Sequence, residues 1–490
     1  MRKFLAVALF ASLSFAATNG DQRLLEAAKS QNHAALKTAI GQKIDVNRTD
    51  VDGMTALIWA AHQDDLDAVK MLLAAGANPK LANRYQLTAL SEAANVGDGE
   101  MIEMLVKAGA DVNVTYGEGE TPLMTASRTG ATRGVKALLE KGADVNAKDS
   151  YHGQTALMWA AAENHQDVAK LLLAAGADVN ARSTLHEFAF RKVAAGGTQA
   201  VYSRGDLTPL MFAARQGSID AGKVLLDARA DIEKAEEENG FTPLLEAIYN
   251  DHYDFAKMLV DRKADLTVGA LFLAVEMRNL DYQGNRPRKA VVGQMDELAF
   301  IKYLLEHGAD PNGPMKTKIP PRAAQNTAIS PDGNTPFIRA ARSADAETMQ
   351  LLIEHGADPN RASDNQTTPM IAAGAGMGKR FQGGEEKPEP QFIEAMKILV
   401  ASGANVNAAN ARGETAMHGA ALRGADLIIQ FLADHGANFN VKNKQNRTPL
   451  DVAMGVGGVA NTGGEAHPTT ATLIRRILAN TAPANAAAKN

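Results

Sequence analysis

The residue patterns that could bind phosphate or a nucleotide are incomplete in this chain. The run from Gly374 to Arg380 is similar to a phosphate-binding loop, in which backbone N–H groups and a Lys hold the phosphates. However, Ala373 stands where that loop needs its first Gly, and Arg380 replaces the Ser/Thr that binds Mg²⁺. The run from Gly455 to Ala460 fits Gly-x-Gly-x-x-Ala, but it follows an expected helix instead of a strand. Neither run predicts a nucleotide site.

Hydrolytic and metal-dependent chemistry also lacks its usual residues. The sequence has no Gly-x-Ser-x-Gly motif and no His-Glu-x-x-His motif. It has no Cys, which excludes disulfides, thiolate zinc sites and a Cys nucleophile. His307, His355 and His435 each precede a Gly-Ala pair at an expected helix end, where an imidazole interacts favourably with the helix dipole. We therefore expect a protein that is not an enzyme, with no catalytic residue, no metal site and no cofactor.

The charge distribution argues against nucleic acid as a partner. The formal net charge is -5, and the basic groups are short, such as Arg286-Pro287-Arg288-Lys289, which is better explained as a solvated loop. A nucleic-acid-binding surface needs a larger basic face or stripe.

The first residues have the pattern of a secretory signal peptide. Arg2 and Lys3 form a positive start, and a short apolar run follows from Phe4 to Phe15. Small residues at Ser14 and Ala16 predict cleavage after Ala16. The apolar run is short for a membrane-spanning helix, and an uncleaved anchor is the alternative. We expect residues 1–16 to be removed and the mature protein to be periplasmic or secreted, without stable insertion in a membrane. The periplasm applies if the host is a Gram-negative bacterium.

One sequence block recurs along the rest of the chain, and it has the features of two helices joined by turns. Each block has a Thr that suits a helix N-cap, often followed by a Pro that is tolerated at the first helical position. An Ala-Ala pair follows, which permits close helix packing. A second apolar stretch then ends in Gly-Ala-Asp/Asn, and its Gly suits the left-handed position after a helix. Many of the blocks are 33 or 34 residues apart, and their threonines are Thr55, Thr88, Thr121, Thr155, Thr208, Thr242, Thr335, Thr368, Thr415 and Thr448.

These residues resemble the ankyrin repeat, in which a β-hairpin finger is followed by two antiparallel helices. One copy runs from Gly153-Gln154-Thr155-Ala156-Leu157 to Gly176-Ala177-Asp178-Val179-Asn180. The family's His after Leu is retained only as His418. Two weaker copies lack the Thr, one near Gln22 and one near Gly269, which gives about twelve repeats. The resemblance implies an all-α repeat solenoid with β-hairpin fingers over residues 17–480. The composition of residues 481–490 predicts a disordered tail.

Five insertions interrupt the period. Those near 181–205 and 311–334 lengthen fingers and could reach over a concave face, whereas those near 279–296, 375–391 and 455–470 lie between the two helices of a repeat. Insertions of this kind carry function in some repeat proteins, and tolerated loop growth is the alternative.

The resemblance also implies a binding surface made of finger tips and the exposed end of each first helix. By register with the Thr, the predicted partner-binding residues are Tyr85, Tyr151, His152 and Phe241 on fingers and His62, Arg128, Arg215, Tyr249 and Arg342 on helices. Tyr and Arg are enriched among interface residues that dominate binding energy, although single aromatic residues also occur on ordinary surfaces. Trp59 and Trp159 are interpreted as packing residues.

The sequence therefore predicts an exported scaffold that binds another protein through a concave surface. Two alternatives remain open: a small-ligand binder or enzyme built from the insertions at 181–205 and 311–334, and a secreted effector that acts in another cell. The identity of the partner does not follow from the sequence, because a fold alone does not specify a function.

Overall fold

The computed structural model describes residues 22–190, 200–237, 239–279, 293–316, 333–375, 388–456 and 466–481. The predicted signal peptide, nearly all of the predicted tail and the central parts of the five insertions lie outside these residues. The chain divides into two compact units, residues 1–236 and 237–490, which are described separately below.

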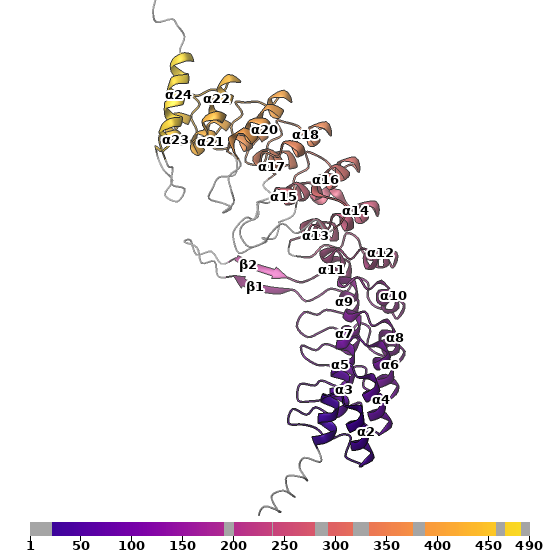
Figure 1. Cartoon of the computed structure of the whole chain (residues 1–490). Helices are drawn as coiled ribbons and strands as arrows, with labels where there is room; N and C mark the ends of the chain where they lie inside the picture. The colour runs from indigo at the N-terminus through magenta and orange to yellow at the C-terminus, as the bar shows by residue number, and fades with distance from the viewer. Residues whose placement is uncertain are drawn as a thin grey trace, which may run out of the picture. The chain divides into compact units, whose positions relative to one another are not determined.

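Unit 1 is a stack of antiparallel helix pairs, in which each first helix packs on the first helix of the next pair (Figure 1). A helix over 22–29 precedes α2 (His33–Gly41). The other pairs are α3 (Ala56–His62) with α4 (Leu66–Ala74), α5 (Ala89–Val96) with α6 (Gly99–Lys107), α7 (Pro122–Thr129) with α8 (Thr132–Glu140), α9 (Ala156–Ala162) with α10 (Gln166–Ala174), and α11 (Pro209–Gln216) with α12 (Ile219–Asp227).

Unit 2 repeats this arrangement. Its pairs are α13 (Pro243–Tyr249) with α14 (Tyr253–Asp261), α15 (Ala270–Arg278) with α16 (Glu297–Glu306), α17 (Pro336–Arg342) with α18 (Ala346–Glu354), α19 (Pro369–Ala375) with α20 (Glu389–Ala401), α21 (Ala416–Arg423) with α22 (Asp426–Asp434), and α23 (Pro449–Ala453) with α24 (Pro468–Thr481). A short 3₁₀ turn, η1 (Leu266–Val268), precedes α15. The predicted all-α repeat architecture is confirmed.

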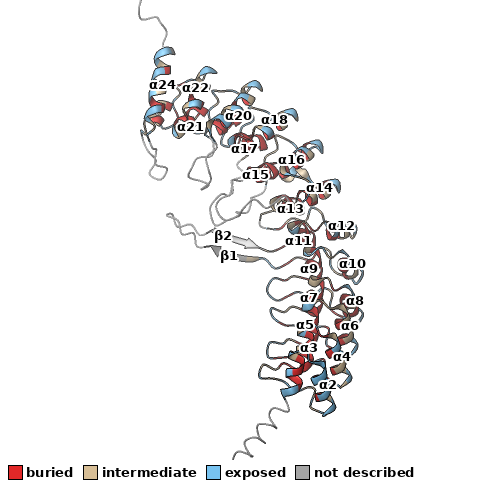
Figure 2. Cartoon of the chain, viewed as in Figure 1, coloured by how far each residue is buried: buried red, intermediate tan, exposed pale blue. Residues whose placement is uncertain are grey.

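The recurring Thr caps the first helix, as the sequence predicts. The hydroxyl of Thr55 accepts a hydrogen bond from the backbone N–H of Ile58 at 3.1 Å, and most of the other threonines bond to the third residue after them in the same way. This bond satisfies one of the N–H groups that a helix start leaves without a partner. The first helices form the core of each unit, since their Ala-Ala pairs, such as Ala60-Ala61, are fully buried (Figure 2).

The fingers of unit 1 extend from the side of the stack where the first helices lie (Figure 1). Among the described residues of these fingers, strand pairing is limited to isolated bridges, such as Thr49 with Thr55 and Ala82 with Thr88, and to one two-stranded antiparallel sheet. That sheet consists of β1 (His186–Phe190) and β2 (Ala200–Arg204), with His186 opposite Arg204. It lies in the insertion near 181–205, so this insertion lengthens a finger, as predicted.

Asparagine side chains join consecutive repeats. Asn113 donates from Nδ2 to the carbonyl of Gly142 at 3.2 Å and accepts through Oδ1 from the N–H of Asp144 at 2.9 Å. Asn146 makes the same two bonds one repeat later, and Asn312, Asn360 and Asn407 do so in unit 2. Both sides of the amide are therefore used to fix the spacing between neighbouring repeats.

Replacing Arg229 with Gly is expected to stabilise unit 1 by about 0.5–1 kcal/mol. Arg229 is exposed and takes the position after a helix that is Gly in most repeats, and its φ is 65°. A residue with a Cβ is strained in this left-handed conformation, whereas Gly is not. The midpoint of urea unfolding measures the effect. Arg229→Ala is the matched control, because it removes the same side chain and retains the strain. An equal gain for both variants would contradict the expectation.

Candidate functional site

Tyr85 lies exposed at a finger tip of unit 1, as predicted, with 59% of its surface accessible. The side chain of Asn83 holds this tip, because its Oδ1 accepts hydrogen bonds from the backbone N–H groups of Tyr85 at 2.8 Å and Leu87 at 2.9 Å. Arg84 covers the ring at 4.8 Å, donates to the Tyr85 hydroxyl at 2.7 Å and forms an ion pair with Asp52 at 2.8 Å. The tyrosine is thus presented to solvent on a well-fixed turn.

A second aromatic group lies at the finger of Tyr151. The Tyr151 ring is 45% exposed, stacks on His186 at 4.6 Å and meets His152 edge-on at 4.6 Å. The Asp149 carboxylate accepts from the N–H groups of Tyr151 at 3.1 Å and His152 at 2.5 Å, which fixes the turn. His186 belongs to β1, so the lengthened finger begins directly against the finger before it. Tyr151 and His152 are brought together as predicted, and His186 was not anticipated.

Two contacts between neighbouring first helices of unit 1 have the same spacing, which is called the contact rule below. The side chain seven residues after an N-cap contacts the side chain four residues after the next N-cap. His62 therefore approaches Glu92, with 2.9 Å between Nδ1 and Oε2, and the Arg128 guanidinium lies 5.6 Å from the Trp159 ring. Arg128 also donates to Asn95 at 3.2 Å. His62 and Arg128 thus each contact the first helix of the next repeat, and residues at these positions form a row along the first helices of unit 1.

Both tryptophans belong to this row, which the sequence interpretation missed. Trp59 and Trp159 are partly exposed, not buried. Trp59 donates from Nε1 to Asp50 at 3.1 Å, and Lys29 lies 4.7 Å from its ring. The spacing in the sequence could have indicated their exposure. Each Trp lies one helical turn before the predicted surface position seven residues after the Thr, so both positions lie on the same face of the helix.

The prediction that Phe241 is an exposed finger aromatic is wrong. Only 2% of Phe241 is accessible, and its ring meets Tyr249 edge-on at 5.6 Å. Phe241 directly precedes the N-cap Thr242, and from that position the side chain turns into the stack. Leu207, which precedes Thr208, is buried for the same reason. Tyr249 itself remains partly exposed.

The two other predicted arginines retain contact with solvent. Arg215 is partly exposed at the end of α11, where its guanidinium lies 5.3 Å from the Phe212 ring. Arg342 is exposed in the last turn of α17. The structure supports one such surface in each unit, called the inner face of that unit from here on. The inner face of unit 1 consists of Tyr85, Tyr151, His152, His62, Arg128 and Arg215, with Trp59 and Trp159, and that of unit 2 of Tyr249 and Arg342.

The described residues contain neither a cluster suited to a metal ion nor a helix suited to crossing a membrane. Within the described residues, no group of three or more His, Asp or Glu side chains has a geometry that could hold a metal ion. None of the helices in the described part of the chain has the length and apolar character needed to cross a membrane. The alternative of a ligand site built from the two long finger insertions is not tested, because residues 191–199 and 317–332 of these insertions lie outside the described residues.

His418 is expected to make unit 2 less stable in acid. Burial lowers the pKa of His418 below its usual 6.5, with the charge of Arg447 adding to the effect and that of Glu414 and the bond to a backbone carbonyl opposing it. The imidazole Nδ1 accepts from the N–H of Thr415 at 3.2 Å, and Nε2 lies 3.1 Å from the carbonyl of Arg447. Only the neutral ring can accept the first bond, so protonation removes it.

Since the unfolded chain binds the proton more tightly, this stabilisation is complete above the unfolded pKa and is lost as pH falls through the folded value. Urea midpoints at about pH 7.5 and about pH 5 measure the change. In His418→Met, which places there the residue found at Met158 and Met211, the pH dependence should be smaller. If the pH dependence of stability were undiminished in this variant, it would arise from titratable groups other than His418.

The comparisons with known proteins agree with this geometry. A family model for ankyrin repeats in three copies matches residues 24–116, 90–183, 194–270 and 389–460, and a single ankyrin-repeat model matches 332–365. Alpha-latroinsectotoxin-Lt1a of Latrodectus tredecimguttatus is 33% identical over 66 residues, 14% of this chain and 5% of the toxin. The ankyrin repeat protein FPV230 of fowlpox virus (strain NVSL) is 31% identical over 70 residues, 14% of this chain and 37% of that protein. The matches thus span small parts of both relatives.

Proposed function

Because the chain belongs to the ankyrin-repeat family, we propose that it is an exported scaffold of about twelve repeats that binds another protein through a concave inner face. Ankyrin repeats generally mediate protein–protein interaction, which agrees with the absence of catalytic motifs from the sequence. The proposal of export rests on residues 1–16, whose pattern predicts a signal peptide. No nucleic acid and no cofactor are part of this function.

The observation that carries the proposal is the pair of finger tyrosines, Tyr85 and Tyr151. A large aromatic ring that is exposed and held rigidly by its own turn loses little conformational entropy when a partner covers it. The neighbouring row of Trp59, Arg128 and Trp159 adds aromatic and guanidinium surface of the kind that dominates binding energy in protein interfaces. A rigid preformed surface of this composition is suited to another folded protein or a peptide segment.

The proposal is tested by affinity capture from the native exported fraction, with residues 17–490 as bait, followed by crosslinking and mass spectrometry. Tyr85→Ala with Tyr151→Ala is expected to reduce the recovery of a specific partner about tenfold or more, since truncation of a dominant interface residue costs about 2 kcal/mol. Leu427→Ala is the matched control, because Leu427 is 54% exposed on α22, a second helix, outside the inner face.

Unchanged recovery of the partner with the double tyrosine variant would show that Tyr85 and Tyr151 do not contribute to binding. The mass of the chain recovered from the exported fraction tests export separately. It should correspond to a start at Ala17, and a mass that includes Met1 would contradict the signal peptide.

A further inference from the structure

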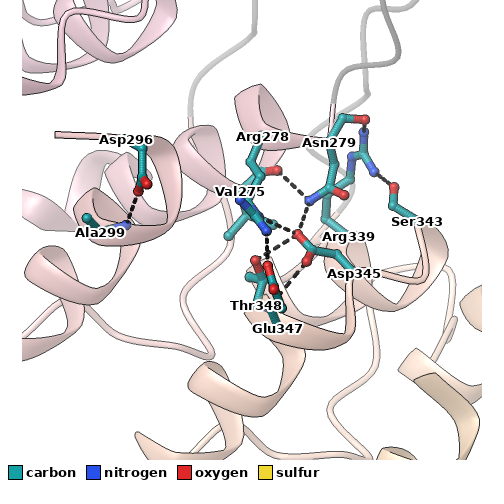
Figure 3. A network of polar contacts seen from close by, with 10 residues as sticks. All are labelled: Val275, Arg278, Asn279, Asp296, Ala299, Arg339, Ser343, Asp345, Glu347 and Thr348. Atoms are coloured by element: carbon teal, nitrogen blue, oxygen red, sulfur yellow. Dashed lines mark hydrogen bonds and ion pairs between the residues drawn. The ribbon is translucent and has the colours of Figure 1, made fainter. Parts of the chain in front are cut away.

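Unit 2 contains a buried ion pair that follows the contact rule of the inner face. Glu276 lies seven residues after the N-cap of α15, and Arg339 lies four residues after the N-cap of α17. The two side chains form an ion pair between Arg339 Nε and Glu276 Oε2, and they are 3% and 2% exposed, respectively. Arg339 also donates to the Ser343 hydroxyl and to the carbonyl of Asn279 at 2.8 Å (Figure 3). All three nitrogens of Arg339 are therefore engaged.

A neighbouring cluster accounts for the other charges of these helices. Arg278 forms ion pairs with Asp345 at 3.0 Å and with Glu347 at 2.6 Å. Asp345 also accepts from Asn279 at 2.8 Å and from the Thr348 hydroxyl at 2.7 Å (Figure 3). Both carboxylates are thus directed to Arg278 and are not partners of the remaining arginine of α17.

That remaining arginine is Arg342, which has no hydrogen-bond or ion-pair partner among the residues that the structure describes. The contact rule explains why. Arg342 lies seven residues after Thr335, and the residue four positions after the next Thr, Thr368, is Ala372. At the corresponding places His62 meets a Glu and Arg128 meets a Trp. Ala372 is 3% exposed, and its methyl group cannot pair with the guanidinium.

The surroundings of Arg342 favour an anion. Arg342 is an exposed residue, but the protein around its guanidinium removes part of the hydration of that group, and the positive charge of Arg339 lies nearby. Both effects lower the pKa of Arg342, and the charge of Glu276 opposes them. Since Glu276 is already paired with Arg339, it does not neutralise the charge of Arg342. Incomplete hydration and the neighbouring charge of Arg339 increase the energy gained when a carboxylate binds.

We propose that Arg342 binds a carboxylate of the partner protein, an Asp or Glu side chain, which takes the role that a side chain of the next repeat has for His62 and Arg128. The planar guanidinium can make two parallel hydrogen bonds to a carboxylate, so Arg342 selects an acidic residue and fixes its orientation. This inference deepens the proposed function and rests on it, because it names the charge that the inner face of unit 2 would recognise in a partner.

The test needs no identified partner. The full mature chain with ¹⁵N-labelled arginine is titrated with acetyl-Ala-Glu-Ala-amide while the Arg Nε–H signals are followed by NMR, and Arg342→Gln assigns the signal of Arg342. The signal is expected to shift in a saturable way, and the affinity for the peptide should fall about tenfold or more in Arg342→Gln. Arg342→Lys should give an intermediate affinity, because it retains the charge without the two-bond geometry.

The controls separate the possible results. The matched peptide acetyl-Ala-Gln-Ala-amide should leave the signal unchanged, and the signal of Arg128, which already bonds to Asn95, should respond less than that of Arg342. Equal shifts with the Glu and Gln peptides, or no saturable shift, would overturn the proposal. Tighter binding of inorganic phosphate than of the Glu peptide would also overturn it, since the site would then favour a phosphate group. None of these results depends on the tyrosines of unit 1, so failure here is distinct from failure of the proposed function.

Discussion

Replacing Glu276 with Gln is expected to lower the free energy of unfolding of unit 2 by about 3–5 kcal/mol, the usual cost of removing one partner from a buried ion pair. Gln retains the shape of Glu276 but leaves the charge of Arg339 without compensation in an interior where that residue is 3% exposed. Urea unfolding measures the loss. Because repeat arrays need not unfold in one step, hydrogen exchange of the amides of α15 and α17 should locate it.

Two further variants show whether the loss comes from the unpaired charge. Glu347→Gln removes a carboxylate from an exposed ion pair with Arg278, where the Glu347 side chain is 72% accessible, so its cost should be within about 1 kcal/mol. The double variant Glu276→Leu with Arg339→Met should recover much of the stability, since well-packed apolar residues often replace buried ion pairs at little cost. If Glu276→Gln costs no more than Glu347→Gln, the pair is not effectively buried.

Phe241→Ala is expected to destabilise unit 2 by about 3–5 kcal/mol, as is usual for truncation of a buried aromatic side chain. The change removes a ring that is 2% exposed and leaves a cavity beside Tyr249. The matched variant Tyr85→Ala truncates an aromatic ring that also belongs to a finger but is 59% exposed, so its effect on stability should be within about 0.5 kcal/mol.

The two variants should therefore separate stability from binding. Phe241→Ala should shift the urea midpoint, and Tyr85→Ala should change partner capture without shifting it. Equal midpoints for the two variants would show that Phe241 does not pack as described, and would restore it as a candidate contact residue.

The sequence alone was sufficient to predict the repeat, its helices and its turns. Thr55 and the threonines that follow it act as N-caps, and Gly76 and its counterparts take positive φ at the helix ends, because both roles depend on the chemistry of a few adjacent residues. The exposure of Tyr85 and Tyr151 could be predicted for a similar reason, since turn tips lie far from the core. The signal peptide and the concave binding surface remain predictions.

Only the tertiary structure decided which side chains of neighbouring repeats meet. Glu276 and Arg339 are 63 residues apart, and their pairing depends on how α15 packs against α17. The burial of Phe241, the partial exposure of the tryptophans and the lack of a partner for Arg342 among the described residues have the same origin. Local sequence sets the conformation of each repeat, but contact, burial and charge compensation depend on the stacking register between repeats, which no single repeat contains.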